Sequence, residues 1–148
     1  ENTSDYFDID CPSPYMLMVC PVKKEKQKEL PDGYDQLPLL EKLYTERSDV
    51  PAVTHIDYSV RVQTVHRKTN PKFYRLLETF KSVTGCPVLV NTSFNVRGEP
   101  IVCSPENAFV CFMRTDMDFL VLGNYLLDKQ EQKNVKELPK FDFINSLD

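Results

Sequence analysis

The sequence predicts an α/β (α+β) fold, a mixed twisted sheet with helices packed on it. Three observations support this class: short apolar runs recur along the chain, two segments carry helix-capping signals, and the expected strands and helices alternate. A chain of 148 residues can bury enough surface to form a hydrophobic core of its own, so we expect one compact domain followed by a tail.

The first expected strand covers residues 15–22, an apolar run that begins after Pro12 and Pro14. Residues 23–33 are charged and end in a Pro-Asp-Gly turn signal, so we expect an exposed loop there. Leucines at helical spacing then predict a short helix over residues 36–47.

Two further strands are expected over residues 53–58 and 60–65. In the second of these, Val60 and Val62 alternate with Arg61 and Gln63. Because residues i and i+2 of a strand point to the same face, Arg61 and Gln63 should share one face and the valines the other.

The clearest helix begins at Asn70-Pro71, a capping side chain followed by proline at the first helical position, and ends at Gly85. Its apolar residues fall on one face: Phe73, Leu76, Leu77, Phe80 and Val83. A brief apolar strand is expected over residues 87–90.

A second capped helix begins at Ser104-Pro105, and its inner face should carry Phe109, Phe112 and Met113. Residues 119–122 predict a last buried strand, closed by Gly-Asn at 123–124. The remaining residues, 128–148, are polar, and we expect a tail with Phe141, Phe143 and Ile144 as a docking patch.

Composition excludes several classes of protein. No apolar run approaches the roughly 20 residues that span a bilayer, so we expect no membrane insertion. The first ten residues lack the basic and apolar regions of a signal peptide, and the five cysteines form no CxxC motif, which favours a reduced, cytoplasmic protein. With two histidines and no paired cysteines, we expect no metal site.

The net charge of −4 is unevenly spread. Residues 55–100 hold seven Lys or Arg against three Asp or Glu, a net +4, so the remainder carries −8. A basic region within an acidic chain suits a compact phosphate better than a nucleic acid backbone, and nucleic acid is therefore an unlikely partner. A solvated basic helix face is the alternative interpretation.

A polar loop at residues 91–98 could bind an anion. The amides of Asn91 and Asn95 and the hydroxyl of Ser93 can donate to phosphate oxygens, and Arg97 can bind them bidentately. The alternative is a turn whose polar side chains bond their own backbone, because Asn, Ser and Gly favour loops.

A second group of candidate binding residues comprises His55, Arg61 and Gln63. Arg61 and Gln63 would face a common ligand, although a merely solvated strand face and a structural histidine are the alternatives. Neither a Ser-His-Asp order nor a thiol–imidazole pair is recognisable, so no residue is assigned a catalytic role. Asp57 and Glu99 are candidate acids or magnesium partners.

Three ordered blocks, residues 51–65, 70–71 and 91–102, resemble the C-terminal domain of the NodU/CmcH carbamoyltransferases. The resemblance covers about residues 5–127. It implies a YrdC-like domain over residues 1–127, truncated at its N-terminus, and a separate tail over residues 128–148.

The resemblance implies that this domain binds ATP and carbamoyl phosphate and forms carbamoyl-adenylate, with Mg²⁺ accompanying ATP. A linked N-terminal, actin-like domain would pass the carbamoyl group to a hydroxyl acceptor and would hold any iron. Carried over by position, the resemblance makes Arg61, Asn91 and Ser93 the contacts to phosphate. The alternative is a YrdC-like module that binds nucleotide or RNA without catalysis.

Two departures from the family pattern bear on activity. Where the family has a small residue, often glycine, after its His-x-Asp element, this chain has Tyr58, which could narrow or reshape the pocket. A phosphate-binding segment of the family would also precede Glu1, so we expect residues 1–148 to be catalytically silent alone.

Overall fold

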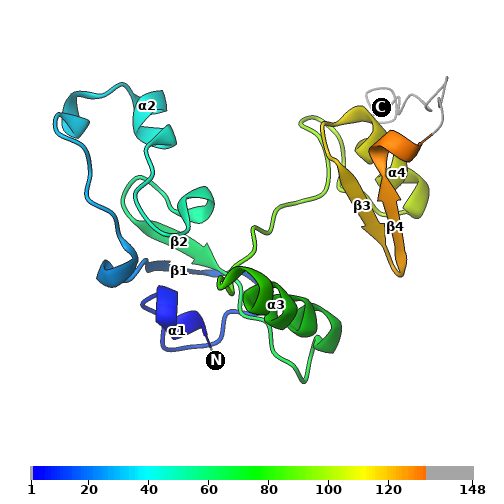
Figure 1. The fold of residues 1–148 in the computed structure, drawn as a ribbon, viewed down its shortest axis with the longest axis horizontal. Coiled ribbons are helices and arrows are strands. Elements are labelled where there is room, and N and C mark those ends of the chain that lie inside the picture. Colours follow the sequence, from blue (N-terminus) through cyan, green and yellow to red (C-terminus); the bar gives the residue numbers. More distant parts are fainter. Residues whose placement is uncertain (1, 133–148) are drawn as a thin grey trace, which may run out of the picture. The chain divides into compact units, whose positions relative to one another are not determined.

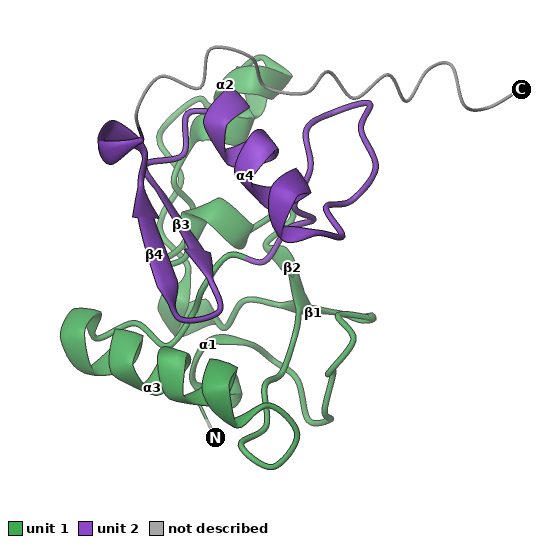
Figure 2. Cartoon of the chain, turned by 90° about the vertical axis from the view of Figure 1, so that its right-hand side faces the viewer, with its two compact units in different colours: residues 1–90 green, residues 91–148 purple. Residues whose placement is uncertain are grey.

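The computed structural model describes residues 2–132, and these divide into two compact units, unit 1 up to residue 90 and unit 2 from residue 91, each of which is described by itself (Figures 1 and 2). Both units mix helices with small antiparallel sheets, which confirms the expected α/β class. The expected docking patch at residues 141–144 lies outside the described residues.

Unit 1 is built around a two-stranded antiparallel sheet of β1 (Met18–Pro21) and β2 (Ser59–Val62), in which Val19 pairs with Arg61. Its helices are α1 (Thr3–Tyr6), α2 (Leu39–Tyr44) and α3 (Pro71–Thr84). The loops between them carry 3₁₀ turns at Lys24–Lys26, Tyr34–Gln36 and Pro51–Val53.

The core of unit 1 gathers apolar side chains from the N-terminal segment, both strands and the loop before β2: Phe7, Cys20, Val22, Val50, Val60 and Val62. The expected strand at residues 15–22 is shorter than predicted, since β1 covers only four of these residues, and Cys20 is its one buried residue. The two buried valines of β2 confirm the predicted alternation.

Helix α3 begins and ends where its caps predict: the Asn70 side chain accepts a hydrogen bond from Phe73 N, and Gly85 follows at φ +78°. Its apolar face, however, contributes no buried residue, and Leu76 and Val83 are exposed. The helix thus forms from its local signals rather than from burial in the core of unit 1.

Unit 2 pairs β3 (Phe119–Leu122) with β4 (Tyr125–Asp128) in an antiparallel hairpin. Helix α4 (Pro105–Arg114), capped by Ser104, packs on β3. Its core is centred on Phe112, which is fully buried with Ala108 and Leu120, and Phe109 and Met113 pack against it as expected. The prediction of a last buried strand at residues 119–122 is wrong in two respects, because only Leu120 of β3 is buried and because β4 follows β3.

Two expected strands do not form. Residues 53–58 end a 3₁₀ turn and then form a second turn, because Tyr58 has the left-handed φ of +62° that extended backbone excludes. Residues 87–90 have no ladder partner in the part of the chain that the structure describes, although Val88 packs against the core of unit 1.

Candidate functional site

The turn at residues 55–59 brings three polar side chains together at the start of β2. His55 N donates to Ser59 O at 2.9 Å, and Tyr58 N donates to His55 O at 3.0 Å, which closes the turn. The side chains follow: His55 Nδ1 lies 2.9 Å from Ser59 Oγ, and Asp57 Oδ1 accepts from Ser59 N at 3.0 Å. Ser59 therefore contacts both the imidazole and the carboxylate.

The charge state of Asp57 follows from these contacts. Hydrogen bonding from the Ser59 side chain, and then from its backbone N–H, lowers the pKa of Asp57 below its ordinary value, and a nearby His55 acts in the same direction. A hydrogen bond to the charged form of a carboxyl favours that form. Asp57 is thus an ionised acceptor in this turn.

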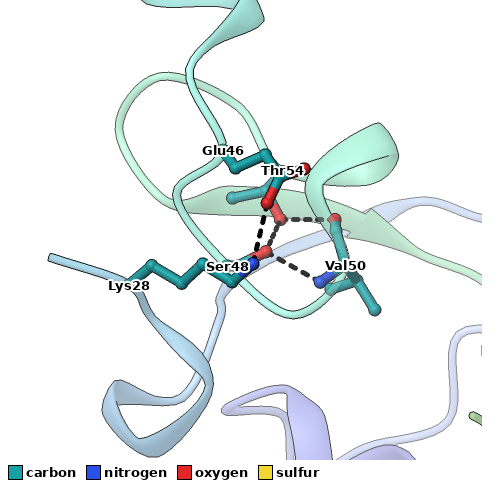
Figure 3. Close-up of polar contacts among 5 residues, drawn as sticks. All are labelled: Lys28, Glu46, Ser48, Val50 and Thr54. Atoms are coloured by element: carbon teal, nitrogen blue, oxygen red, sulfur yellow. Dashed lines mark hydrogen bonds and ion pairs between the residues drawn. The ribbon is translucent and has the colours of Figure 1, made fainter. Parts of the chain in front are cut away.

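Thr54, the residue before this turn, is buried, and its hydroxyl belongs to a small hydrogen-bond network (Figure 3). Thr54 Oγ1 lies 2.7 Å from Ser48 Oγ and 2.8 Å from Val50 O, and Ser48 Oγ accepts from Val50 N at 3.0 Å. The Lys28–Glu46 ion pair, 2.8 Å long, lies at the exposed side of the same loop. This network fixes the backbone from which His55 departs.

Arg47 is a buried cation in the same loop, with a side chain that donates only to backbone carbonyls among the described residues. Its Nη1 donates to Thr54 O at 3.0 Å, and its Nη2 donates to Lys42 O and Leu43 O in the last turn of α2. Arginine near a helix end can satisfy the last carbonyls of the helix. Sequence reasoning did not single out Arg47, Ser48 or Ser59, because nothing in their spacing distinguishes them from solvated residues.

Arg61 and Gln63 are exposed and lie on one face of the β2 segment, as predicted, while Val60 and Val62 are buried on the other. Both side chains reach the loop before β1: Arg61 Nη2 donates to Met16 O at 3.3 Å and Gln63 Nε2 donates to Pro14 O at 2.8 Å. These bonds brace the loop. A guanidinium has five N–H donors, so Arg61 retains further donors for an anion.

Tyr58 occupies a position where the backbone itself favours glycine. Its φ of +62° is left-handed, a conformation that costs free energy for every residue with a Cβ atom and that glycine adopts freely. Its hydroxyl donates to Lys28 O at 3.3 Å and does not take part in the contact between His55 and Ser59. The backbone conformation therefore explains a glycine preference here without reference to a pocket.

The second group of candidates lies in unit 2, on the loop before α4. Asn95 Nδ2 donates to Glu99 O at 2.8 Å and to Val96 O at 3.2 Å, so its amide holds the loop closed. Asn91, Ser93 and Arg97 are exposed. Neither Ser93 nor Arg97 has a side-chain hydrogen bond or ion pair within the described residues.

The candidate acid Glu99 is engaged within unit 2. Its Oε1 lies 3.4 Å from Arg114 Nη1, and both side chains are partly exposed. Among residues 2–132, no three His, Cys, Asp or Glu side chains gather closely enough to hold a metal ion. No helix in that part of the chain is long and apolar enough to cross a membrane.

The two groups of candidate residues thus belong to different units: His55, Arg61 and Gln63 to unit 1, and Asn91, Ser93, Asn95 and Arg97 to unit 2. Within unit 1, Arg61 and Gln63 both donate to the loop before β1. The turn that carries His55 lies at the start of β2. Within unit 2 the three residues differ: the Asn95 side chain donates to backbone carbonyls of its own loop, whereas Ser93 and Arg97 are exposed.

Residues 1–129 match the family described as Carbamoyltransferase C-terminus. A Synechocystis protein named "Uncharacterized protein sll1178" is 53% identical over 148 residues, all of this chain and 24% of the relative. Nodulation protein NolO of Bradyrhizobium diazoefficiens is 44% identical over 106 residues, 69% of this chain and 19% of the relative.

The 3'-hydroxymethylcephem-O-carbamoyltransferase of Amycolatopsis lactamdurans is 49% identical over 57 residues, 38% of this chain and 11% of the relative. The chain therefore spans about a quarter or less of the length of these relatives.

Proposed function

This chain belongs to the carbamoyltransferase C-terminus family, and from that premise we propose that it serves as the C-terminal domain of an O-carbamoyltransferase. In this proposal it binds carbamoyl phosphate and ATP, which form carbamoyl-adenylate, and a linked N-terminal, actin-like domain passes the carbamoyl group to a hydroxyl acceptor. The name of the Amycolatopsis relative, an O-carbamoyltransferase, supports the type of reaction.

The observation that carries the proposal is the exposed donor set on the loop at residues 91–97. The Ser93 hydroxyl and the Arg97 guanidinium are exposed and make no side-chain bond within the described residues, whereas the amide nitrogen of neighbouring Asn95 donates two hydrogen bonds within the loop. Hydroxyl and guanidinium groups are the donors that phosphate oxygens accept, and Arg can bind them bidentately. These residues suit the phosphates of carbamoyl phosphate or ATP.

Within unit 1, taken by itself, Arg61, Gln63 and His55 are the candidate contacts to substrate. The role of all these groups is electrostatic: fixed donors align the reactants and neutralise charge that develops on phosphate oxygens. Mg²⁺ would enter with ATP, because this ion usually binds through substrate phosphates and keeps several waters. The protein would be cytoplasmic, and any iron would belong to the N-terminal domain.

Calorimetric titration of this chain with carbamoyl phosphate, and with ATP plus Mg²⁺, tests the proposal. A hydrogen bond to a charged group contributes about 1.5–3 kcal/mol, so Arg61→Ala and Ser93→Ala should each weaken binding roughly tenfold to a hundredfold. Arg67→Ala, which removes an exposed arginine outside the candidate set, is the matched control and should bind as the unaltered chain does.

Three outcomes are informative. Weakening by the two site variants alone supports the proposal. Binding that survives both substitutions shows that the anion contacts lie elsewhere. If the unaltered chain binds neither ligand, the proposal that residues 1–148 hold the substrate site is wrong as stated, and we expect binding to require the longer protein.

A further inference from the structure

Helix α2 lies in the long loop between β1 and β2 and adds no residue to the core of unit 1 (Figure 1). Four of its six residues are large, apolar and more than half exposed, and we call them the α2 patch: Leu39, Leu40, Leu43 and Tyr44. Residues four apart are neighbours on a helix surface, so the four side chains adjoin one another. Exposed apolar side chains that adjoin one another mark an interaction surface.

The sequence signals of α2 do not account for the helix. No side chain caps it, and its six residues are far fewer than the roughly 12–15 at which an isolated helix becomes even marginally stable. Helix α3 differs, because it has 14 residues and Asn70 caps it. The position of α2 therefore depends on contacts from outside the helix.

Arg47 supplies such contacts. Its buried guanidinium donates to Lys42 O and Leu43 O in α2, and to Thr54 O at 3.0 Å. Arg47 Nε has no hydrogen-bond partner, and no acidic side chain pairs with Arg47 in the part of the chain that the structure describes. Burying an unpaired cation costs free energy, and this cost is spent on a helix that buries none of its own residues. Side chains that are already held in place lose less freedom when a partner covers them.

The α2 patch is too small for a stable complex between separate molecules. Interfaces of standard size have about 20–30 residues a side, and association costs roughly 4–15 kcal/mol of translational and rotational freedom. Two linked parts of one chain avoid most of this cost, because the link keeps them at a high effective concentration. A patch of four side chains therefore suits a covalently linked partner better than a second copy of the chain.

The relatives are long enough to contain such a partner. The match to the Synechocystis relative covers all of this chain but only 24% of that protein, so about three quarters of the relative lies outside it. We infer that the α2 patch docks on an apolar surface of the remaining part of the carbamoyltransferase chain, and that Arg47 holds the helix in position for this contact. The inference rests on the proposed function, whose linked N-terminal domain would carry that surface.

Hydrogen exchange followed by mass spectrometry tests this contact. A chimera, in which this chain replaces the matching segment of the Synechocystis relative, is compared with the chain alone. The backbone N–H groups of residues 42–45 should exchange roughly tenfold or more slowly in the chimera, because docking opposes the opening of α2. Leu40→Ser combined with Leu43→Ser should abolish the slowing. Glu41→Gln, which alters an exposed polar residue of the same helix, is the matched control and should preserve it.

Arg47→Lys tests the role of the arginine. Lysine keeps the positive charge but lacks the planar fork that donates to α2 and to Thr54 O together. The variant should therefore show less slowing in the chimera, with circular dichroism to show that it is folded. Slowing as large as that of the unaltered chimera would overturn the role given to Arg47.

Equal exchange at residues 42–45 in the chimera and in the chain alone would overturn the inference. Slowing that grows with the concentration of the chain alone would also overturn it, because a second copy would then cover the patch. If the chimera does not fold, the same comparison between the whole Synechocystis relative and its matching segment decides the question.

Neither measurement of exchange uses a ligand, so its failure is distinct from failure of the proposed function. Equal exchange together with ligand binding that depends on Arg61 would overturn the inference alone. Slowed exchange in α2 of a chain that binds neither carbamoyl phosphate nor ATP would support the contact and overturn the proposed function.

Discussion

Tyr58 offers a sharp test of the turn that carries His55, because its backbone conformation favours glycine. A left-handed φ, here +62°, costs an L-residue other than glycine roughly 1–2 kcal/mol. We compare Tyr58→Ala with Tyr58→Gly, since both variants lose the side chain and its 3.3 Å hydrogen bond to Lys28 O. The difference between them then reports the backbone alone.

Glycine removes the cost of about 1–2 kcal/mol but enlarges the unfolded ensemble, which costs roughly 0.5–1 kcal/mol. With the middle values of the two terms, about 1.5 and 0.75 kcal/mol, Tyr58→Gly should be more stable than Tyr58→Ala by about 0.75 kcal/mol. For small proteins the urea dependence of unfolding is about 1–3 kcal/mol per M, so the midpoints should differ by a few tenths of 1 M, with the glycine variant higher.

Tyrosine fluorescence during urea unfolding is a suitable reporter, because the chain has no tryptophan and six of its seven tyrosines, all but Tyr125, lie in unit 1. The matched control is Glu78, inside α3, where φ is negative and glycine should be less stable than alanine by about 1 kcal/mol. The order of the Gly and Ala variants should thus reverse between the two positions. The same order at both positions, or an alanine variant at 58 as stable as the glycine variant, would refute the reasoning.

Two further predictions concern thiols and acid. Burial raises the pKa of the Cys20 thiol, so alkylation at neutral pH, followed by mass spectrometry, should modify exposed Cys103 well before Cys20; equal rates would contradict the core of unit 1. Hydrogen bonding from Ser59 lowers the pKa of Asp57 below its ordinary value of 3.8, so its contribution to stability should be complete above that value and lost as pH falls through the lowered pKa. Thermal unfolding across this acidic range should show a smaller loss of stability in Asp57→Asn than in the unaltered chain, and equal losses would contradict the predicted linkage.

The helices could be predicted from sequence because their signals are local. Asn70 and Ser104 each cap a helix whose first residue is proline, and both caps form in the structure. Such a cap needs only residues within one turn of the helix. The burial of the helices could not be predicted equally well: α4 packs on β3, whereas α3 contributes no buried residue, although both sequences carry an apolar face.

The strands were harder to predict because pairing depends on distant residues. Residues 87–90 have the composition of a strand but no ladder partner in the described chain, and residues 53–58 are interrupted by the left-handed Tyr58. The hairpin of β3 and β4 was missed although a local signal existed. Gly-Asn at 123–124 lies between two apolar runs, and the pairing of Leu122 with Tyr125 makes it a two-residue turn of the kind this dipeptide favours.

For the candidate site, sequence predicts which residues can donate to an anion but not which donors the fold already uses. Gln63 and Asn95 both serve backbone carbonyls, Gln63 across 49 positions of sequence and Asn95 within its own loop. The exposed donors of Ser93 and Arg97 make no such bond in the described part of the chain. Residue type alone cannot separate these two classes, because an amide that braces a loop and one that binds a phosphate present the same N–H groups.

The distinction has a thermodynamic consequence. A donor that holds the loop contributes to folding, so its removal leaves a carbonyl unsatisfied and lowers stability as well as any binding that depends on the loop. A donor with no partner in the described part of the chain contributes little to the folding of that part, so its removal should affect chiefly the binding of a ligand. Asn95 belongs to the first class, Ser93 and Arg97 to the second, and Arg61 to both, because it donates to Met16 O and retains further N–H groups. Arg61 is therefore the residue at which the stability of the β1–β2 region and the affinity for phosphate should be coupled.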